Sequence, residues 1–242
     1  MVKPQEINQD TKFHIPSSSG GITTVFHPFL RGNYQTLFNS VNFQGDKKMP
    51  TGRDNADFVH AIYCGTEEFR NSPEAEEARG KMKEATLYVP VVQIYTPCGF
   101  KVGDEDRFGV YAVFDEKGLG KDLEFNPEEL EEILRKGDKI DPKIILGAGV
   151  GFAHRDTYRG RTHDSKQLST DGQIIITYTP DGAKKLAEAS RRFNNNPRTW
   201  IEDNPNEIVK RVSGLVGNGI GLGAYGSSNG DSDKAFSFAV KK

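Results

Sequence analysis

A short apolar run, Ile144-Ile145-Leu146, leads into residues 147–164, which read Gly-Ala-Gly-Val-Gly-Phe-Ala-His-Arg-Asp-Thr-Tyr-Arg-Gly-Arg-Thr-His-Asp. The apolar run predicts a short strand, and the small residues that follow it predict a turn. The polar part gathers two histidines, three arginines and two aspartates. Scaffolds that contain a sheet often present binding residues on such a loop, so we expect the segment 148–166 to carry the site.

Helix and strand signals alternate on both sides of this stretch. Thr51, Ser72-Pro73, Asn126-Pro127 and Thr179-Pro180 are typical helix starts, the first leading a helix at 52–63. Such interleaving predicts an α+β fold: a single mixed domain with a largely antiparallel central sheet and three or four helices. Pro90 indicates an edge or a bulge in its strand. The expected strands are 87–96, 107–114, 143–147, 173–178, 200–201, 208–216 and 235–240.

Length and composition are those of a protein with one sizeable core. The chain has 242 residues, of which 27% are charged and 35% hydrophobic. Residues 1–22 are polar and end in Ser-Ser-Ser-Gly-Gly, so we expect a flexible amino-terminal arm, followed by one domain at 23–242. No apolar window is long enough for a signal peptide or a membrane span. We therefore predict a soluble, cytoplasmic protein with no membrane partner.

Charge and cysteine content argue against several function classes. The net charge of -2 disfavours a nucleic-acid partner, which usually meets an excess of Lys and Arg. Cys64 and Cys98 stand alone, without a Cys-x-x-Cys pair, so we expect reduced thiols and no zinc ribbon. The glycine-rich residues 217–224 lack the helix that must follow a dinucleotide fingerprint. We predict no cofactor.

The polar segment supplies the candidate site residues. Arg155, Arg159 and Arg161 form a candidate clamp for phosphate or carboxylate, because the planar guanidinium matches both anions. His154, Asp156 and His163 are weak catalytic candidates, since histidine exchanges protons near neutral pH. Both histidines with Asp156 and Asp164 are also a conceivable metal set. Solvated loops of this composition are commoner than metal sites, and we predict no metal.

Two hypotheses for the function follow. The first is a binding or interaction protein that holds an anionic small molecule or a protein partner at 148–166. The second is an enzyme that acts on a phosphorylated or carboxylated small molecule, with the arginines as clamp and a histidine as acid or base. We favour the first, because no motif has the spacing that catalysis requires. The oligomeric state does not follow from the sequence.

Several short motifs occur in order between about residue 45 and residue 242. They are Met49-Pro50-Thr51, Tyr95-Thr96-Pro97 with Gly99, Glu129-Leu130-Glu131-Glu132-Ile133-Leu134 with a Gly-Asp turn, Gly182-Ala183-Lys184-Lys185-Leu186-Ala187-Glu188, Arg211-Val212-Ser213-Gly214-Leu215 and Ala235-Phe236-Ser237-Phe238. Together they resemble a group of small soluble archaeal hypothetical proteins. The resemblance implies a cytoplasmic, archaeal-type domain and no mechanism.

Overall fold

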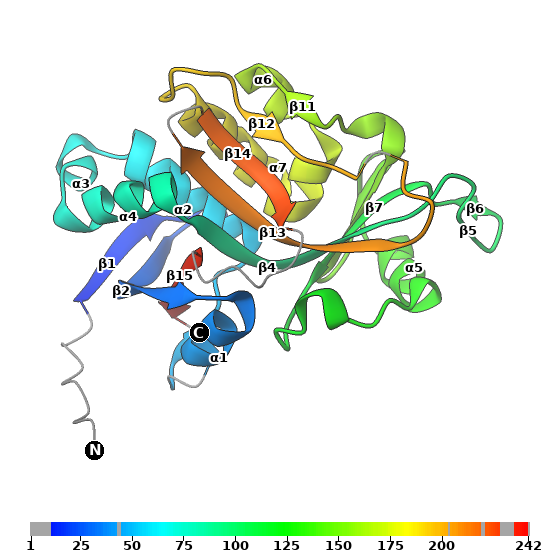
Figure 1. The fold of residues 1–242 in the computed structure, drawn as a ribbon, viewed down its shortest axis with the longest axis horizontal. Helices are drawn as coiled ribbons and strands as arrows, with labels where there is room; N and C mark the ends of the chain where they lie inside the picture. Colours follow the sequence, from blue (N-terminus) through cyan, green and yellow to red (C-terminus); the bar gives the residue numbers. More distant parts are fainter. Residues whose placement is uncertain (1–10, 43–44, 203, 219–220, 228–234, 242) are drawn as a thin grey trace.

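A computed structural model describes residues 11–42, 45–202, 204–218, 221–227 and 235–241. Most of its strands join one large curled sheet (Figure 1). The strands are β1 (Thr11–Pro16), β2 (Ile22–Gly32), β3 (Lys47–Lys48), β4 (Thr86–Tyr95), β5 (Lys101–Val102), β6 (Glu105–Asp106), β7 (Gly109–Phe114), β8 (Asp138–Asp141), β9 (Ile144–Leu146), β10 (Val150–His154), β11 (Arg161–Thr162), β12 (Arg198–Thr199), β13 (Val209–Asn218), β14 (Gly221–Ser227) and β15 (Ala235–Lys241).

The main path of the sheet runs β11-β12-β14-β13-β4-β7-β10-β9-β8, and β15 connects β1, β2 and β3 to it. Among the described strands, only the pairs β12–β14 and β15–β4 are parallel. The remaining pairs are antiparallel, which confirms the predicted α+β class with a largely antiparallel sheet. The strands β5 and β6 form a separate small hairpin.

Strand β4 changes partner around Pro90, where the sequence indicated an edge or a bulge. β4 pairs with β15 at Thr86 and Leu87, and with β7 from Val91 onward. Its register with β13 shifts between Val212 and Gly214, opposite this point. Because proline cannot donate to a ladder, it sits where β4 changes partner, and the predicted bulge is present.

Seven α-helices occur among the described residues, where three or four were expected. Two of them, α3 and α6, are single turns of four residues. The helices are α1 (Tyr34–Asn42), α2 (Gly52–Cys64), α3 (Glu67–Arg70), α4 (Pro73–Glu84), α5 (Pro127–Arg135), α6 (Ser165–Leu168) and α7 (Gly172–Ser190), with short 3-10 turns η1 (Gly120–Asp122) and η2 (Arg155–Thr157). None of the described helices is long and apolar enough to cross a membrane.

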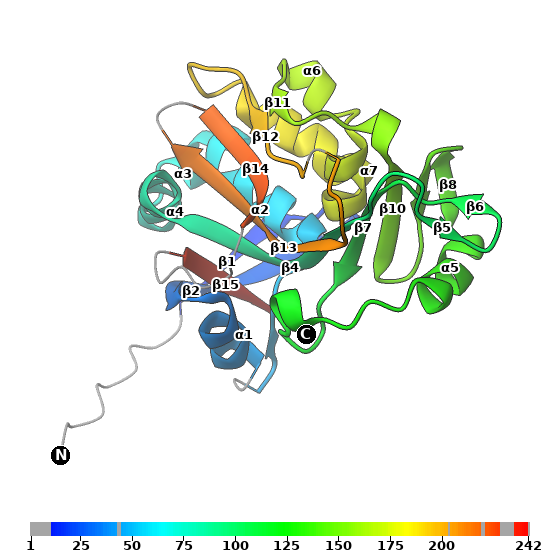
Figure 2. The same ribbon diagram turned by 45° about the vertical axis from the view of Figure 1, so that its right-hand side comes forward.

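Helices lie on opposite faces of the sheet, with α7 on one face of β10 and α5 on the other (Figure 2). Val91 and Ala112 belong to the core shared with α2 and α7, whereas Val92 and Tyr111 pack toward Leu134 of α5. This period of two is what a strand covered on both faces requires. Helices α2 and α7 also pack against each other.

Local signals located three helix starts correctly. The Thr51 hydroxyl accepts from the Asp54 N–H, and the Asp54 carboxylate accepts from the Thr51 N–H, a complete capping box. Ser72 and Asn126 cap α4 and α5, each followed by proline at the first helical position.

The predicted strand at 173–178 is wrong, because these residues form the first half of α7. Asp171 accepts from the Ile174 N–H and so starts a helix. A short, continuously apolar run cannot distinguish a buried strand from a buried helix, and here both faces of the run are covered. The expected cap at Thr179-Pro180 is present: Thr179 has non-helical dihedral angles, and its hydroxyl accepts from the Gly182 N–H.

Two further expectations need correction. Strand β1 at 11–16 pairs with β2, and Ile15 lies in the core, so this part of the expected arm at 1–22 belongs to the sheet. Residues 1–10 lie outside the described residues. The short strand expected at 200–201 instead lies two positions earlier, at Arg198–Thr199.

Candidate functional site

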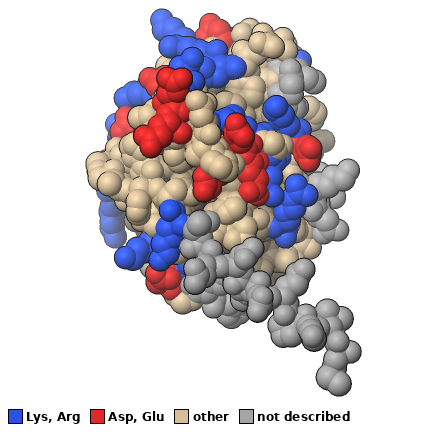
Figure 3. All heavy atoms as spheres, turned by 90° about the vertical axis from the view of Figure 1, so that its left-hand side faces the viewer, with Lys and Arg blue, Asp and Glu red and all other residues tan. Residues whose placement is uncertain are grey.

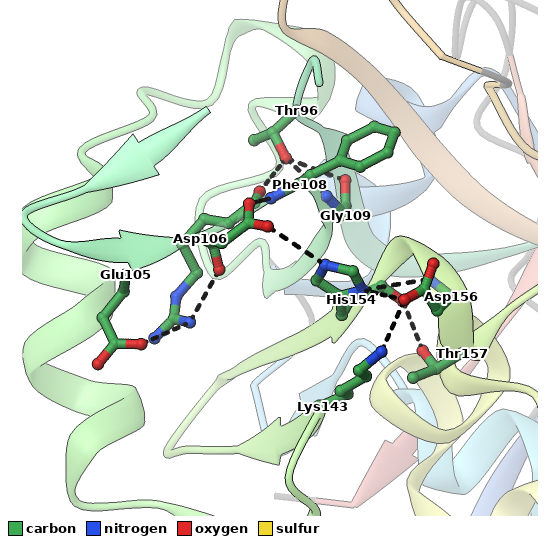
Figure 4. Close-up of polar contacts among 10 residues, drawn as sticks. Thr96, Glu105, Asp106, Phe108, Gly109, Lys143, His154, Asp156 and Thr157 are labelled. Atoms are coloured by element: carbon green, nitrogen blue, oxygen red, sulfur yellow. Dashed lines mark hydrogen bonds and ion pairs between the residues drawn. The ribbon is translucent and has the colours of Figure 1, made fainter. Parts of the chain in front are cut away.

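His154, at the end of β10, lies in a charged surface cluster (Figure 4). Its Nε2 is 3.6 Å from the Asp106 carboxylate, and its Nδ1 is 3.4 Å from that of Asp156. Nδ1 also accepts from the Asp156 N–H, so the neutral ring carries its proton on Nε2, facing Asp106. The structure thus brings the predicted His154 and Asp156 together with Asp106, a partner that the sequence analysis missed.

The charged side chains of this cluster pair with one another. Lys143 Nζ lies 2.6 Å from the Asp156 carboxylate, and this hydrogen bond lowers the pKa of Asp156. The Asp156 side chain is 62% exposed, so water screens the pair strongly. A histidine between two carboxylates at the surface is well placed for hydrogen bonding, and it does not line either of the hollows described below.

Two arginines of the predicted clamp, Arg155 and Arg159, have described side chains, and their surroundings differ. Arg155 donates from Nη1 to the Tyr158 carbonyl oxygen, and its guanidinium lies over the Tyr158 ring. Arg161 lies in β11, and its side chain is outside the described part of the structure. Arg159 is exposed, forms no ion pair with a described residue and lines a hollow.

That hollow, the His163 hollow, has a volume of about 520 Å³. Buried His163 lies in its wall with Nε2 2.7 Å from the Arg159 carbonyl oxygen and 2.6 Å from Thr199 Oγ1. A carbonyl oxygen only accepts, so Nε2 carries a proton. The lining residues are Asp156, Thr157, Tyr158, Arg159, Gly160, His163, Gln167, Thr170 and Asp171.

Asp171 is the most perturbed acid in the site. Its carboxylate caps α7, accepts from the Arg159 N–H at 3.1 Å and lies 3.9 Å from His163 Nε2. Burial raises the pKa of Asp171 to about 6, against the opposing effects of these N–H donors and of His163. A buried carboxyl with a raised pKa beside a histidine is suited to proton transfer, although both side chains also hold the 159–163 loop in place.

A larger hollow, the basic groove, lies where α2 begins and α7 is interrupted. Its volume is about 720 Å³. One bank consists of Ser19, Lys48 and the start of α2 at 51–54; the other consists of residues 136–138 and the turn between β9 and β10 at 147–149. Its floor includes the apolar side chains Val91, Ala112, Phe114, Leu146 and Ile176.

Close backbone contact shapes the inner end of the groove. A Cβ atom on Gly52 would lie 1.9 Å from the Thr177 carbonyl oxygen, so only glycine fits at the first position of α2. Two residues further along α7, Thr179 adopts φ 69° and ψ 162°, a conformation almost restricted to glycine. The interruption lets a second helical segment begin beside the groove, and N–H groups of a first helical turn lack intrahelical partners.

Three basic side chains of the groove have no acidic partner among the described residues. Lys48, Arg53 and Lys136 line it, and none of them forms an ion pair with a described residue. The carboxylate of Asp54 also lines the groove and accepts hydrogen bonds in the capping box. Asp138, on β8, is the second acid there. The described lining therefore carries three cations and two carboxylates, with no ion pair between them.

The structure differs from the sequence analysis in which residues it assembles. His154 and His163 belong to separate clusters, and within the described residues no three His, Cys, Asp or Glu side chains are grouped to hold a metal. The set of His154, Asp156, His163 and Asp164 is thus not assembled. The basic groove was missed, although its two helix starts, Thr51 and Thr179, were recognised individually.

Comparisons of the chain with protein-family models, with curated proteins and with solved structures gave no match. The expected relation to a group of archaeal proteins stays a prediction.

Proposed function

We propose that this protein binds a small anionic ligand in the basic groove. The observation that carries the proposal is the convergence of Lys48, Arg53 and Lys136, from three separate segments, on one hollow without acidic partners among the described residues. Cations that line a concave surface attract anions. Apolar side chains on one side of that surface exclude water and so strengthen the attraction. The first turn of α2 lines the same hollow, and the positive end of that helix dipole also favours an anion.

The proposal keeps part of the segment that the sequence indicated. Residues 148–150 line the groove, but Arg155 and Arg159 do not. A role for these arginines in holding an anion or a partner stays a prediction. Arg159 is the strongest of the three, because its guanidinium is exposed at the His163 hollow.

Calorimetric titration with inorganic phosphate and phenyl phosphate at low salt tests the proposal. The triple variant Lys48→Gln/Arg53→Gln/Lys136→Gln should bind at least about tenfold more weakly than the natural chain, since charge-assisted contacts are the strong ones. The control Lys83→Gln/Lys117→Gln/Arg192→Gln removes the same charge from exposed positions outside the groove. Its affinity should change by less than about twofold, because exposed charges are screened. Equal losses of affinity in both variants would refute the groove as the anion-binding site.

An enzyme acting on a phosphorylated or carboxylated small molecule is the second candidate function. The observation that favours it is the buried His163–Asp171 pair beside the exposed Arg159 in one hollow. Its test is turnover of such compounds that His163→Gln abolishes while far-ultraviolet circular dichroism stays unchanged. Turnover that survives this variant would remove His163 from the chemistry.

The two cysteines bear on the cellular compartment, and the surface charge bears on the class of partner. Cys64 and Cys98 are free thiols, in keeping with a reducing compartment, and we place the protein in the cytoplasm. On the face that carries α3 and α4, basic and acidic side chains are interspersed rather than gathered by sign (Figure 3). Such a mixed surface does not favour a polyanionic nucleic-acid partner, so a small anion remains our proposal.

A further inference from the structure

We infer that the ligand of the basic groove is a phosphate monoester with a flat apolar body, rather than an inorganic anion. The inference rests on the proposed function and deepens it: the basic banks receive the phosphate, and the apolar floor receives the body of the molecule. It depends on three properties of the groove, namely the side chains of its floor, its size and its charge.

The floor is a continuous apolar surface on one face of the sheet. Ala112 and Phe114 stand two positions apart on β7 and so point to the same side. Phe114 is the cross-strand partner of Val91, and Ala112 is connected through Gly151 to Leu146 in the same row. Ile176 of α7 completes this surface. Phe114 and Leu146 are only partly buried, so they retain area that a ligand can cover.

Size separates an organic ligand from a free ion. Cavities of about 300–1,000 Å³ hold drug-sized organic molecules, and this groove measures about 720 Å³. Neighbouring strands lie about 4.8 Å apart, so the β4–β7–β10 part of the sheet offers a width of roughly 10 Å. One ring or two fused rings match this width, whereas inorganic phosphate would leave the floor covered by water.

The number of basic groups favours a phosphate over a carboxylate. Lys48, Arg53 and Lys136 line the groove with two acids, Asp138 and the Asp54 of the capping box, so its lining carries a net charge of +1. A phosphate monoester carries a charge of about −1.5 to −2 at pH 7 and offers three acceptor oxygens. A carboxylate carries a single negative charge and offers two oxygens. Each of the three basic groups can therefore meet one phosphate oxygen, whereas a carboxylate leaves one of them without an oxygen of its own.

The experiment compares four probes by calorimetric titration of the full chain: inorganic phosphate, phenyl phosphate, 1-naphthyl phosphate and benzoate. We expect phenyl phosphate to bind at least about tenfold more tightly than inorganic phosphate, naphthyl phosphate more tightly still, and benzoate more weakly than phenyl phosphate. Leu146→Asn should remove most of the advantage of the aromatic phosphates and leave inorganic phosphate unaffected. Retained phosphate binding shows that the variant is folded. Leu130→Asn, at a comparably half-buried leucine of α5 outside the groove, is the matched control.

The outcomes separate this inference from the proposal beneath it. No binding of any probe would refute the anion-binding function itself. Equal affinities for inorganic and aromatic phosphates, or an advantage that Leu146→Asn leaves intact, would overturn only the assignment of an apolar body. Benzoate binding as tightly as phenyl phosphate would overturn the preference for the phosphate group.

Discussion

The polar segment 148–166 and the basic groove share a boundary but differ in how their charges are used. In the segment, His154 and Asp156 meet Asp106 and Lys143, and His163 is bonded to main-chain and hydroxyl oxygens. In the groove, Lys48, Arg53 and Lys136 have no acidic partner among the described residues. The polar side chains of the segment thus form hydrogen bonds and ion pairs that hold their own loop in place. The cations without a described acidic partner come instead from positions that no sequence motif marks.

The largest effect should come from closing the inner end of the groove with Gly52→Ala. Its new methyl group would fall 1.9 Å from the Thr177 carbonyl oxygen, so α2 and α7 must separate. We expect a loss of about 1–3 kcal/mol in the free energy of unfolding, as for other overpacked sites, measured by urea denaturation. Anion affinity should fall as well, because the bank at 51–54 moves.

A matched substitution shows whether glycine itself is the cause. Gly80 is exposed in the middle of α4, and a Cβ there would meet nothing within 4 Å. Gly80→Ala should therefore stabilise the protein by about 0.5–1 kcal/mol through helix propensity. A stable Gly52→Ala protein with unchanged anion binding would contradict the close α2–α7 contact.

A second prediction concerns Asp171 in the His163 hollow and how the free energy of unfolding depends on pH. Burial raises the pKa of Asp171 to about 6, above the value of about 3.9 in an unfolded chain. Between these values the native state binds more protons than the unfolded state, so this group's contribution to stability falls as pH rises from about 4 to about 6. Asp171→Asn keeps a capping oxygen and removes the titration.

Urea denaturation of both proteins at pH 4, 5, 6 and 7 measures this contribution. Relative to Asp171→Asn, the natural chain should lose stability with rising pH, by about 1–3 kcal/mol over the interval. The titration of all other acids is common to both proteins and cancels in the difference. Parallel stability curves would show that Asp171 is not perturbed as the structure indicates.

The smallest effect on stability and anion affinity should come from a substitution in the His154 cluster, although the sequence singled out this segment first. Asp156→Asn removes the carboxylate that pairs with Lys143 and lies near His154, but that carboxylate is largely exposed. Exposed pairs contribute little because water and salt screen them. We expect a melting temperature and an anion affinity indistinguishable from those of the natural chain, by scanning calorimetry and titration. A marked loss in either would give the His154 cluster a role that its surroundings do not suggest.

Local chemistry explains which parts of the fold were predictable. Thr51, Ser72 and Asn126 mark helix starts because capping involves residues three positions apart, which the sequence displays directly. The apolar run 173–178 was misjudged because burial on all sides erases the periodicity that separates helix from strand. The α+β class survived this error, since several other strands carried the pattern.

The basic groove was beyond sequence reasoning for a different reason. Lys48 and Lys136 are far apart in the chain and meet because β4 pairs with β15 at one end and with β7 at the other. Nothing local to either lysine records this pairing. The absence of acidic partners among the described residues is likewise a property of the folded state alone, so the sequence indicated only residues 148–150 of the groove and none of its basic side chains.

A crossed titration with phenyl phosphate tests most directly whether the groove, and not the arginine-rich segment, holds the anion. The two proteins to compare are Lys48→Gln/Arg53→Gln/Lys136→Gln and Arg155→Gln/Arg159→Gln/Arg161→Gln, each with three positive charges removed. We predict that the first loses at least about tenfold in affinity while the second stays within about twofold of the natural chain. Loss of binding in the second variant with retention in the first would contradict the account.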